Sequence, residues 1–138
     1  MSPPTTLQRR IYISTSWRNT LRLENKSAIG QSYGGPEYAL SWLETQLGLQ
    51  RKTVSNAKRT LQYAARLKKA ELKVCAESFA LDAWGTAANL LQRRDDLLIW
   101  GWDGKDDKRL PALAHDLAAT EAVEGILAPG TPERLSAA

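Results

Sequence analysis

The sequence predicts a mostly helical α/β fold, in which short N-terminal strands are followed by four or five helices. Two short runs, residues 11–13 and 21–23, are rich in aliphatic residues, and the second alternates apolar and polar positions as strands do. From residue 36 onward, apolar residues recur three and four positions apart, which is the spacing of amphipathic helices. Because 43% of the 138 residues are apolar, we expect the chain to bury a core.

The chain has the length of one domain. Residues 1–10 are polar and include two prolines, so we expect a flexible lead before the folded part. Thr131 and Pro132 have the pattern of a helix start, yet the sequence ends soon after them. We therefore interpret residues 11–138 as a single domain or as the N-terminal fragment of a larger one.

Local signals predict the first two helices. One covers residues 37–47, and Gly48 suits its C-terminal cap. The second begins at Thr53 or Ser55, which are both good N-caps, and continues to about residue 73. We expect its basic residues to face outward. The residues expected to face inward are Val54, Ala57, Leu61, Ala64, Ala65 and Ala70.

The later helices follow from similar signals. Asp82 is a good N-cap for a third helix that ends at Gly101. Pro111 starts a short helix through residue 119, and the pattern can be extended to residue 127. The predicted inward stripe of the third helix consists of Trp84, Ala87, Ala88, Leu91 and Leu98. We expect Trp84, Trp100 and Trp102 to pack in the core rather than to stack on bases.

Several classes of protein are excluded by the composition. With one cysteine, Cys75, and one histidine, His115, the chain has no internal disulfide framework and none of the usual structural zinc sites. We find no catalytic constellation and assign no cofactor, so we expect no enzyme activity from this chain alone. No apolar run is long enough to span a bilayer, and no secretory signal is present. The sequence therefore predicts a cytoplasmic protein without a membrane partner.

Charge is unevenly distributed along the chain. Residues 1–73 contain 13 Lys and Arg residues but four Asp and Glu residues, a net charge of +9. Residues 74–138 contain six basic and 11 acidic residues, a net charge of −5. This split indicates either a surface that faces a polyanion or two patches that pair within an assembly. Ordinary solvated helix faces would also produce it.

Residues 47–55 resemble the turn and the recognition-helix start of helix-turn-helix DNA-binding proteins. Gly48 permits a sharp turn, and Val54 could anchor the second helix. Glu44 departs from this pattern, because a small residue is usual where the two helices touch. The nucleic-acid-binding residues that we predict are Arg51, Lys52, Ser55, Asn56, Lys58, Arg59 and Arg66.

The order of a short strand, two glycines and a helix at residues 32–36 is that of a phosphate-binding loop. Such loops also need a lysine and a hydroxyl group that binds magnesium, and the turn here has no Gly-Lys-Ser/Thr sequence. A degenerate, inactive version of the loop is compatible with these residues.

Further along the chain, Arg94 and Asp95 interrupt an apolar stripe of the third predicted helix. This pattern predicts either an internal ion pair or a contact with another domain.

A resemblance to a known family extends from about residue 34 to residue 135. It rests on Leu-Glu-Thr-Gln-Leu-Gly-Leu at 43–49, Ser-Phe-Ala-Leu-Asp-Ala-Trp at 78–84, Arg-Asp-Asp-Leu at 94–97 and Gly-Trp-Asp-Gly at 101–104. These segments resemble the N-terminal region of AddB/RecC-like inactivated-helicase proteins that carry a PD-(D/E)XK nuclease domain. Ala83 and Arg93 depart from the pattern, which usually has proline and an aromatic residue there.

The resemblance implies an ATPase-dead, helicase-like lobe of a DNA end-processing machine, with the nuclease motif far beyond residue 138. The expected function is therefore a non-catalytic module of a DNA-repair helicase–nuclease, which scaffolds the complex and contacts DNA through its basic half. Its expected partners are DNA and the other domains or subunits of that complex. The alternatives are a stand-alone helix-turn-helix protein and a protein-interaction domain that uses its acidic half.

Overall fold

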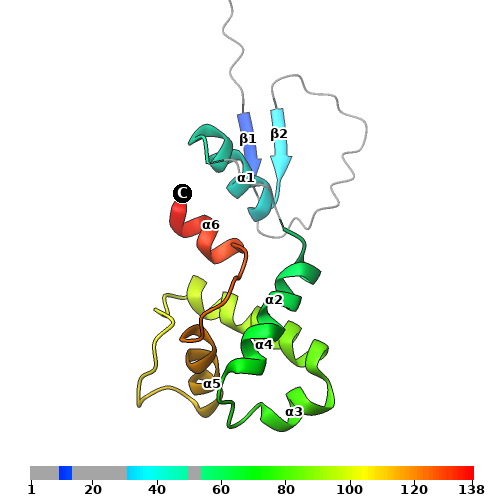
Figure 1. The fold of residues 1–138 in the computed structure, drawn as a ribbon. Coiled ribbons are helices and arrows are strands. Elements are labelled where there is room, and N and C mark those ends of the chain that lie inside the picture. Colours follow the sequence, from blue (N-terminus) through cyan, green and yellow to red (C-terminus); the bar gives the residue numbers. More distant parts are fainter. Residues whose placement is uncertain (1–9, 14–30, 50–53) are drawn as a thin grey trace, which may run out of the picture. The chain divides into compact units, whose positions relative to one another are not determined.

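The computed structural model describes residues 10–13, 31–49 and 54–138, which are mostly helical (Figure 1). The chain divides into two compact units, residues 1–51 and 52–137, where the sequence predicts one domain over 11–138. The division follows from the packing, because the first helix packs with the N-terminal strands and the later helices share a core of their own. No helix among the described residues is long and apolar enough to cross a membrane.

The first unit contains β1 (Arg10–Ile13), β2 (Gln31–Gly34) and α1 (Pro36–Gln46). The two strands pair in parallel, with Arg10 opposite Gln31 and Ile13 opposite Gly34. The expected strand at residues 11–13 falls within β1, whereas the one at 21–23 lies outside the described residues.

The predicted end of the first helix is confirmed. The helix predicted over 37–47 agrees with α1 to within one residue at each end. Gly48, with φ of +68°, provides the left-handed turn that follows it.

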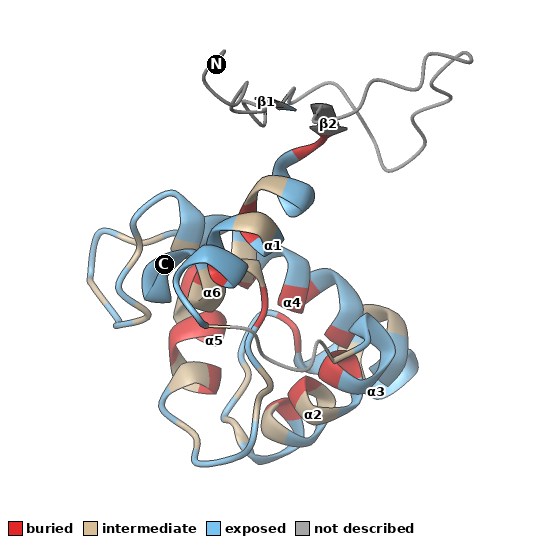
Figure 2. Ribbon diagram, turned by 90° about the horizontal axis from the view of Figure 1, so that it is seen from above, coloured by how far each residue is buried: buried red, intermediate tan, exposed pale blue. Residues whose placement is uncertain are grey.

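The second unit is built from five helices. They are α2 (Asn56–Lys69), α3 (Ala76–Leu81), α4 (Ala83–Ile99), α5 (Ala112–Glu121) and α6 (Thr131–Ala137). The long helix α4 packs against α2, α3 and α6, and α5 packs against α2 (Figure 1). The buried core residues lie where these helices face one another (Figure 2) and consist of Tyr63, Leu67, Cys75, Ala87, Leu90, Leu91 and Leu117.

Two predicted N-caps are confirmed. The Ser55 hydroxyl accepts a hydrogen bond from the backbone N–H of Lys58 at 3.3 Å, so α2 starts at the second of the two proposed positions. The Asp82 carboxylate accepts one from the N–H of Gly85 at 2.9 Å at the start of α4. In both cases a short polar side chain satisfies a backbone donor that the first helical turn leaves free.

The predicted inward face of α2 is only partly correct, because Ala64 packs against the core whereas three other predicted residues do not. Leu61 is 63% exposed, and Ala57 and Ala65 are also exposed. The larger side chains of Tyr63 and Leu67 fill the core instead, because they remove more apolar area from water. The residues that α2 buries are Arg59, Thr60, Tyr63 and Leu67.

The tryptophans also differ from expectation. Trp84 and Trp100 are 51% and 88% exposed, so only Trp102 packs partly against the core. In α4 the predicted residues Ala87 and Leu91 are buried, whereas Ala88 is exposed with Trp84. The buried stripe of this helix is Ala87, Leu90, Leu91 and Arg94.

A buried carboxylate joins α5 to the segment between α2 and α3. Asp116 is 2% exposed and accepts hydrogen bonds from the backbone N–H groups of Lys73, Val74 and Cys75, each at 2.8 Å. Burial, with the Asp116 charge nearby, raises the pKa of the Cys75 thiol above its usual value. Cys75 is therefore a core residue, as the sequence predicts, and Asp116 sets the chain direction at the start of α3.

We expect Asp116→Asn to lower the free energy of unfolding by about 2–3 kcal/mol, because an amide has one acceptor oxygen and cannot satisfy three buried donors. Urea unfolding followed by circular dichroism measures the change. Glu124→Gln, at an exposed position, is the control and should leave the midpoint unchanged. Equal midpoints for both variants would contradict the role of Asp116.

Candidate nucleic-acid interface

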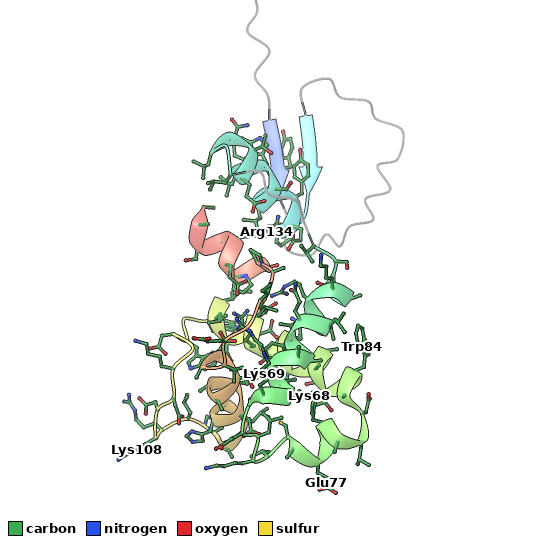
Figure 3. All side chains as sticks on the ribbon, viewed as in Figure 1. Lys68, Lys69, Glu77, Trp84, Lys108 and Arg134 are labelled. Carbon is green, nitrogen blue, oxygen red and sulfur yellow. The ribbon has the colours of Figure 1, made fainter. Side chains whose placement is uncertain are left out.

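Helix α2 contains no acidic residue, and its charged side chains divide between two faces. Its lysines, Lys58, Lys68 and Lys69, are exposed, and none of them forms an ion pair within the described residues. Figure 3 shows Lys68 and Lys69 on this helix. Lys58 and Lys69 are 11 residues apart, which corresponds to about 16 Å along a helix. The outer face of α2 therefore presents positive charge over a length that can contact more than one phosphate.

The predicted nucleic-acid-binding residues do not share one surface. Arg51 and Lys52 lie outside the described residues. Ser55, Asn56 and Lys58 are exposed at the first turn of α2, where the Ser55 hydroxyl is already used as the N-cap.

Arg66 is half-buried and is committed to the fold. Its Nε and Nη2 atoms donate to the Gly125 carbonyl at 3.2 and 2.6 Å. The side chain therefore ties α2 to the segment that follows α5, and it is poorly placed to contact a phosphate.

The structure contradicts the prediction that Arg59 binds nucleic acid, because this residue is only 5% exposed. Its Nη1 and Nη2 atoms donate to the two carboxylate oxygens of Asp95 at 2.7 and 3.2 Å, and Nε donates to the Ala128 carbonyl at 3.0 Å. This two-point geometry is the strong form of an arginine–carboxylate pair. A phosphate would have to displace these partners, so we remove Arg59 from the candidate interface.

Arg59 belongs to a charged cluster, which we define as Arg59, Arg94, Asp95, Glu121 and Glu133. Arg94 lies at its centre and is 6% exposed. The Arg94 side chain is 2.8 Å from Asp95, 2.6 Å from Glu121 and 2.6 Å from Glu133. The cluster thus connects α2, α4, α5 and α6 through side chains of both signs.

Arg94 and Glu133 keep their charged forms despite the effect of burial. Burial alone lowers the pKa of Arg94 and raises that of Glu133, since it disfavours the charged forms. The hydrogen bonds and charges of Glu121 and Glu133 together more than offset the effect of burial and raise the pKa of Arg94 above its usual value. The backbone N–H of Gly130, at 2.8 Å, and Arg94 likewise hold the pKa of Glu133 below its usual value.

Arg94 and Asp95 therefore form part of an internal network of the second unit. This corrects the interpretation in which they contact another domain, because their side chains are 7% and 13% exposed and both have partners of opposite charge inside the cluster. Sequence reasoning missed Glu121 and Glu133, which are far from Arg94 along the chain. The one available signal was a pair of charges within an apolar stripe, and that signal does not identify distant partners.

The other two sequence motifs are the helix-turn-helix pattern at residues 47–55 and the phosphate-loop pattern at residues 32–36. In the helix-turn-helix hypothesis, α1 belongs to the first unit and α2 to the second, and residues 50–53 between them lie outside the described residues. That arrangement stays a prediction. In the phosphate-loop hypothesis, β2 ends at Gly34, Gly35 is the N-cap of α1, and Pro36 occupies the first helical position.

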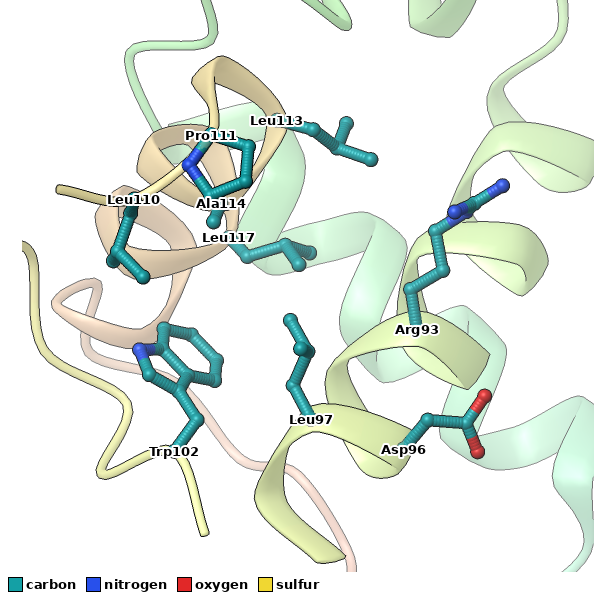
Figure 4. Close-up of a pocket in the computed structure, with 9 residues that line it drawn as sticks. All are labelled: Arg93, Asp96, Leu97, Trp102, Leu110, Pro111, Leu113, Ala114 and Leu117. Carbon is teal, nitrogen blue, oxygen red and sulfur yellow. The ribbon is translucent and has the colours of Figure 1, made fainter. Parts of the chain in front are cut away.

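The second unit also contains an apolar pocket between α4, α5 and the loop that joins them (Figure 4). Its volume is about 450 Å³. Leu97 and Leu117 point into it, and Trp102 closes one end. Arg93 and Asp96 of α4 contribute the charged groups at its edge.

Comparison with known proteins finds no matching family model, no matching curated protein and no matching solved structure. The resemblance to inactivated-helicase proteins accordingly stays a prediction from the sequence.

We expect Asp95→Asn to destabilise the fold by about 3 kcal/mol, because the buried Arg59 loses the carboxylate that accepts two of its hydrogen bonds, and its other carboxylate contact, Glu133, is 3.9 Å away. Chemical unfolding measures the loss. Asp107→Asn is the matched control, since Asp107 pairs with Arg109 at 2.9 Å on the exposed loop after α4. The control should leave the unfolding midpoint in place, and a similar loss in both variants would contradict the importance of the cluster.

Glu133 should make the stability depend on acid pH. Because its pKa is lower in the folded state, its contribution is fully present above the ordinary value of 4.5 and is lost as the pH falls through the lowered folded value. The free energy of unfolding is measured from pH 7 down to the lowest pH at which the protein stays folded. Below pH 4.5, it should decrease less in Glu133→Gln than in the unaltered protein. Glu77→Gln, at an exposed position of α3, should retain the full decrease.

Proposed function

We propose that this chain is a non-catalytic, ATPase-dead, helicase-like module of a DNA-repair helicase–nuclease. In this proposal it scaffolds the complex and contacts DNA through the outer face of α2. The observation that carries the DNA contact is the division of charge on α2. Its arginines bind groups of the chain itself, whereas its exposed lysines have no acidic neighbour on their own helix.

The charge type favours backbone contact over base reading. Lysine supplies a flexible point charge that binds a phosphate oxygen without regard to sequence. Arginine is the residue that most often reads guanine, and both described arginines of α2 are engaged in the fold. The arrangement therefore supports weak, sequence-tolerant binding of the kind expected for a strand-guiding module.

The glycine turn supports the ATPase-dead part of the proposal. A Cβ atom added at Gly34 would collide with the ring of Tyr38, so the aromatic side chain lies directly against this turn. Residues 32–36 include neither the lysine nor the following hydroxyl that hold a nucleotide and its magnesium in working loops. The residues therefore fit a strand–turn–helix that lacks the groups that hold ATP in working loops.

A stand-alone helix-turn-helix protein is the alternative hypothesis, and its residue set is reduced by the structure. Ser55 and Asn56 stay exposed at the start of α2, but Arg59 does not. Replacing Arg59 would disturb the charged cluster, so that substitution cannot serve as a test of DNA reading. The two hypotheses differ instead in whether binding depends on DNA sequence.

The test is a fluorescence anisotropy titration of duplex and single-stranded DNA over a series of salt concentrations. Lys68→Ala combined with Lys69→Ala should weaken binding and reduce the slope of log affinity against log salt by about one for each lysine in contact. Lys105→Ala combined with Lys108→Ala removes the same charge from the loop after α4 and should have little effect.

Three outcomes would contradict the proposal. Equal weakening by both double variants would mean that binding responds to net charge and not to α2. A strong preference for one duplex sequence would favour the helix-turn-helix alternative. No binding at low salt would remove DNA contact by this chain and leave a protein-interaction role.

A further inference from the structure

The surface at the C-terminal end of α4 carries a protruding tryptophan next to an apolar pocket. Trp100 is 88% exposed, the most exposed of the large apolar side chains in the described residues. Its backbone N–H donates to the Asp96 carbonyl at 3.0 Å, so it continues the last turn of the helix. A single exposed apolar side chain is common on protein surfaces, but one that lies next to an apolar pocket suggests a binding surface.

Trp100 and one wall of the pocket lie on the same face of α4. Arg93, Asp96, Leu97 and Trp100 are spaced by three, four and seven residues, which aligns them along one stripe of a helix. The first three line the pocket, and Trp100 lies one turn beyond them. The same surface therefore offers both an apolar side chain that projects and an apolar hollow that could receive one.

The charges along this stripe can pair with a copy of themselves. Arg93 and Asp96 have opposite signs and lie about one turn apart. The Arg93 Nε atom donates to Asn89 at 2.8 Å, Asp96 Oδ1 accepts a hydrogen bond from Gln92 at 3.0 Å, and both charged side chains are exposed. Because the patch has no net charge, a second copy meets it without the repulsion that a single-sign surface would produce.

We propose that this surface is a two-fold interface between two copies of the chain, in which Trp100 of each copy inserts into the apolar pocket of the other. A two-fold axis across the stripe makes the two α4 helices antiparallel, so that a projection and a hollow on one face meet their counterparts simultaneously. Arg93 of one copy is then directed toward Asp96 and Trp100 of the other. Such a contact combines an ion pair with a cation–aromatic interaction.

The size of the pocket suits this occupant. Its volume of about 450 Å³ exceeds what one indole ring requires, and its lining of Leu97, Leu113 and Leu117 is apolar. Inserting a tryptophan buries about 150–250 Å² of that side chain, and the two symmetric insertions form the centre of the single dimer interface. This interface involves α4 and α5 rather than the lysines of α2, so it does not depend on the proposed function.

The test is sedimentation equilibrium of the full chain over a wide range of protein concentration. The unaltered protein should dimerise reversibly, and Trp100→Ala should raise the dimer dissociation constant by roughly 30-fold or more. Leu97→Trp, which fills the mouth of the pocket, should weaken the dimer as well. Trp84→Ala is the matched control, because Trp84 is an exposed tryptophan of the same helix that does not line the pocket.

A charge exchange tests the pairing across the axis. Arg93→Asp alone should weaken the dimer, and combining it with Asp96→Arg should restore it, since the exchanged charges again face opposite partners. A monomer at every concentration would overturn the proposal, as would a dimer that Trp100→Ala leaves intact or that Trp84→Ala weakens equally. Urea unfolding of each variant distinguishes loss of the dimer from loss of the fold.

Discussion

The second unit depends on a buried arginine that is surrounded by three carboxylates. Arg94 projects from the middle of α4 and pairs with its neighbour Asp95 and with Glu121 and Glu133 from later segments. A guanidinium removed from water is costly unless its donors are satisfied, so each of these acids becomes necessary once Arg94 is buried. The cluster consequently holds α5 and α6 against α4 more specifically than apolar contact alone would.

The same cluster determines which surfaces stay available for binding. The Arg59–Asp95 pair holds α2 in an orientation in which Tyr63 and Leu67 are buried in the core and the lysines face water. The candidate DNA-contacting face is therefore compatible with the internal ion pair on the other side of the same helix. At the opposite edge of α4, the residues that avoid the cluster line the apolar pocket and lead to Trp100.

Local features were the most predictable part of the fold. The N-caps at Ser55 and Asp82 and the turn at Gly48 follow from side chains that satisfy nearby backbone groups, or from a backbone angle that glycine tolerates. The inward faces were less predictable. Alanines and Leu61 looked suitable for the core of α2, but alanine is small enough to be tolerated on either face, so its spacing does not identify the buried side.

The sequence by itself determined the mostly helical character, most helix starts, the uneven charge and the core position of Cys75. These depend on residues within a few positions of one another or on simple composition. Only the tertiary structure decided that Arg59 and Arg94 are internal, that Asp116 holds three backbone donors, and that Trp84 and Trp100 are exposed. Each of these depends on partners 27 to 69 residues away or on the direction in which a helix packs, and local pattern contains neither.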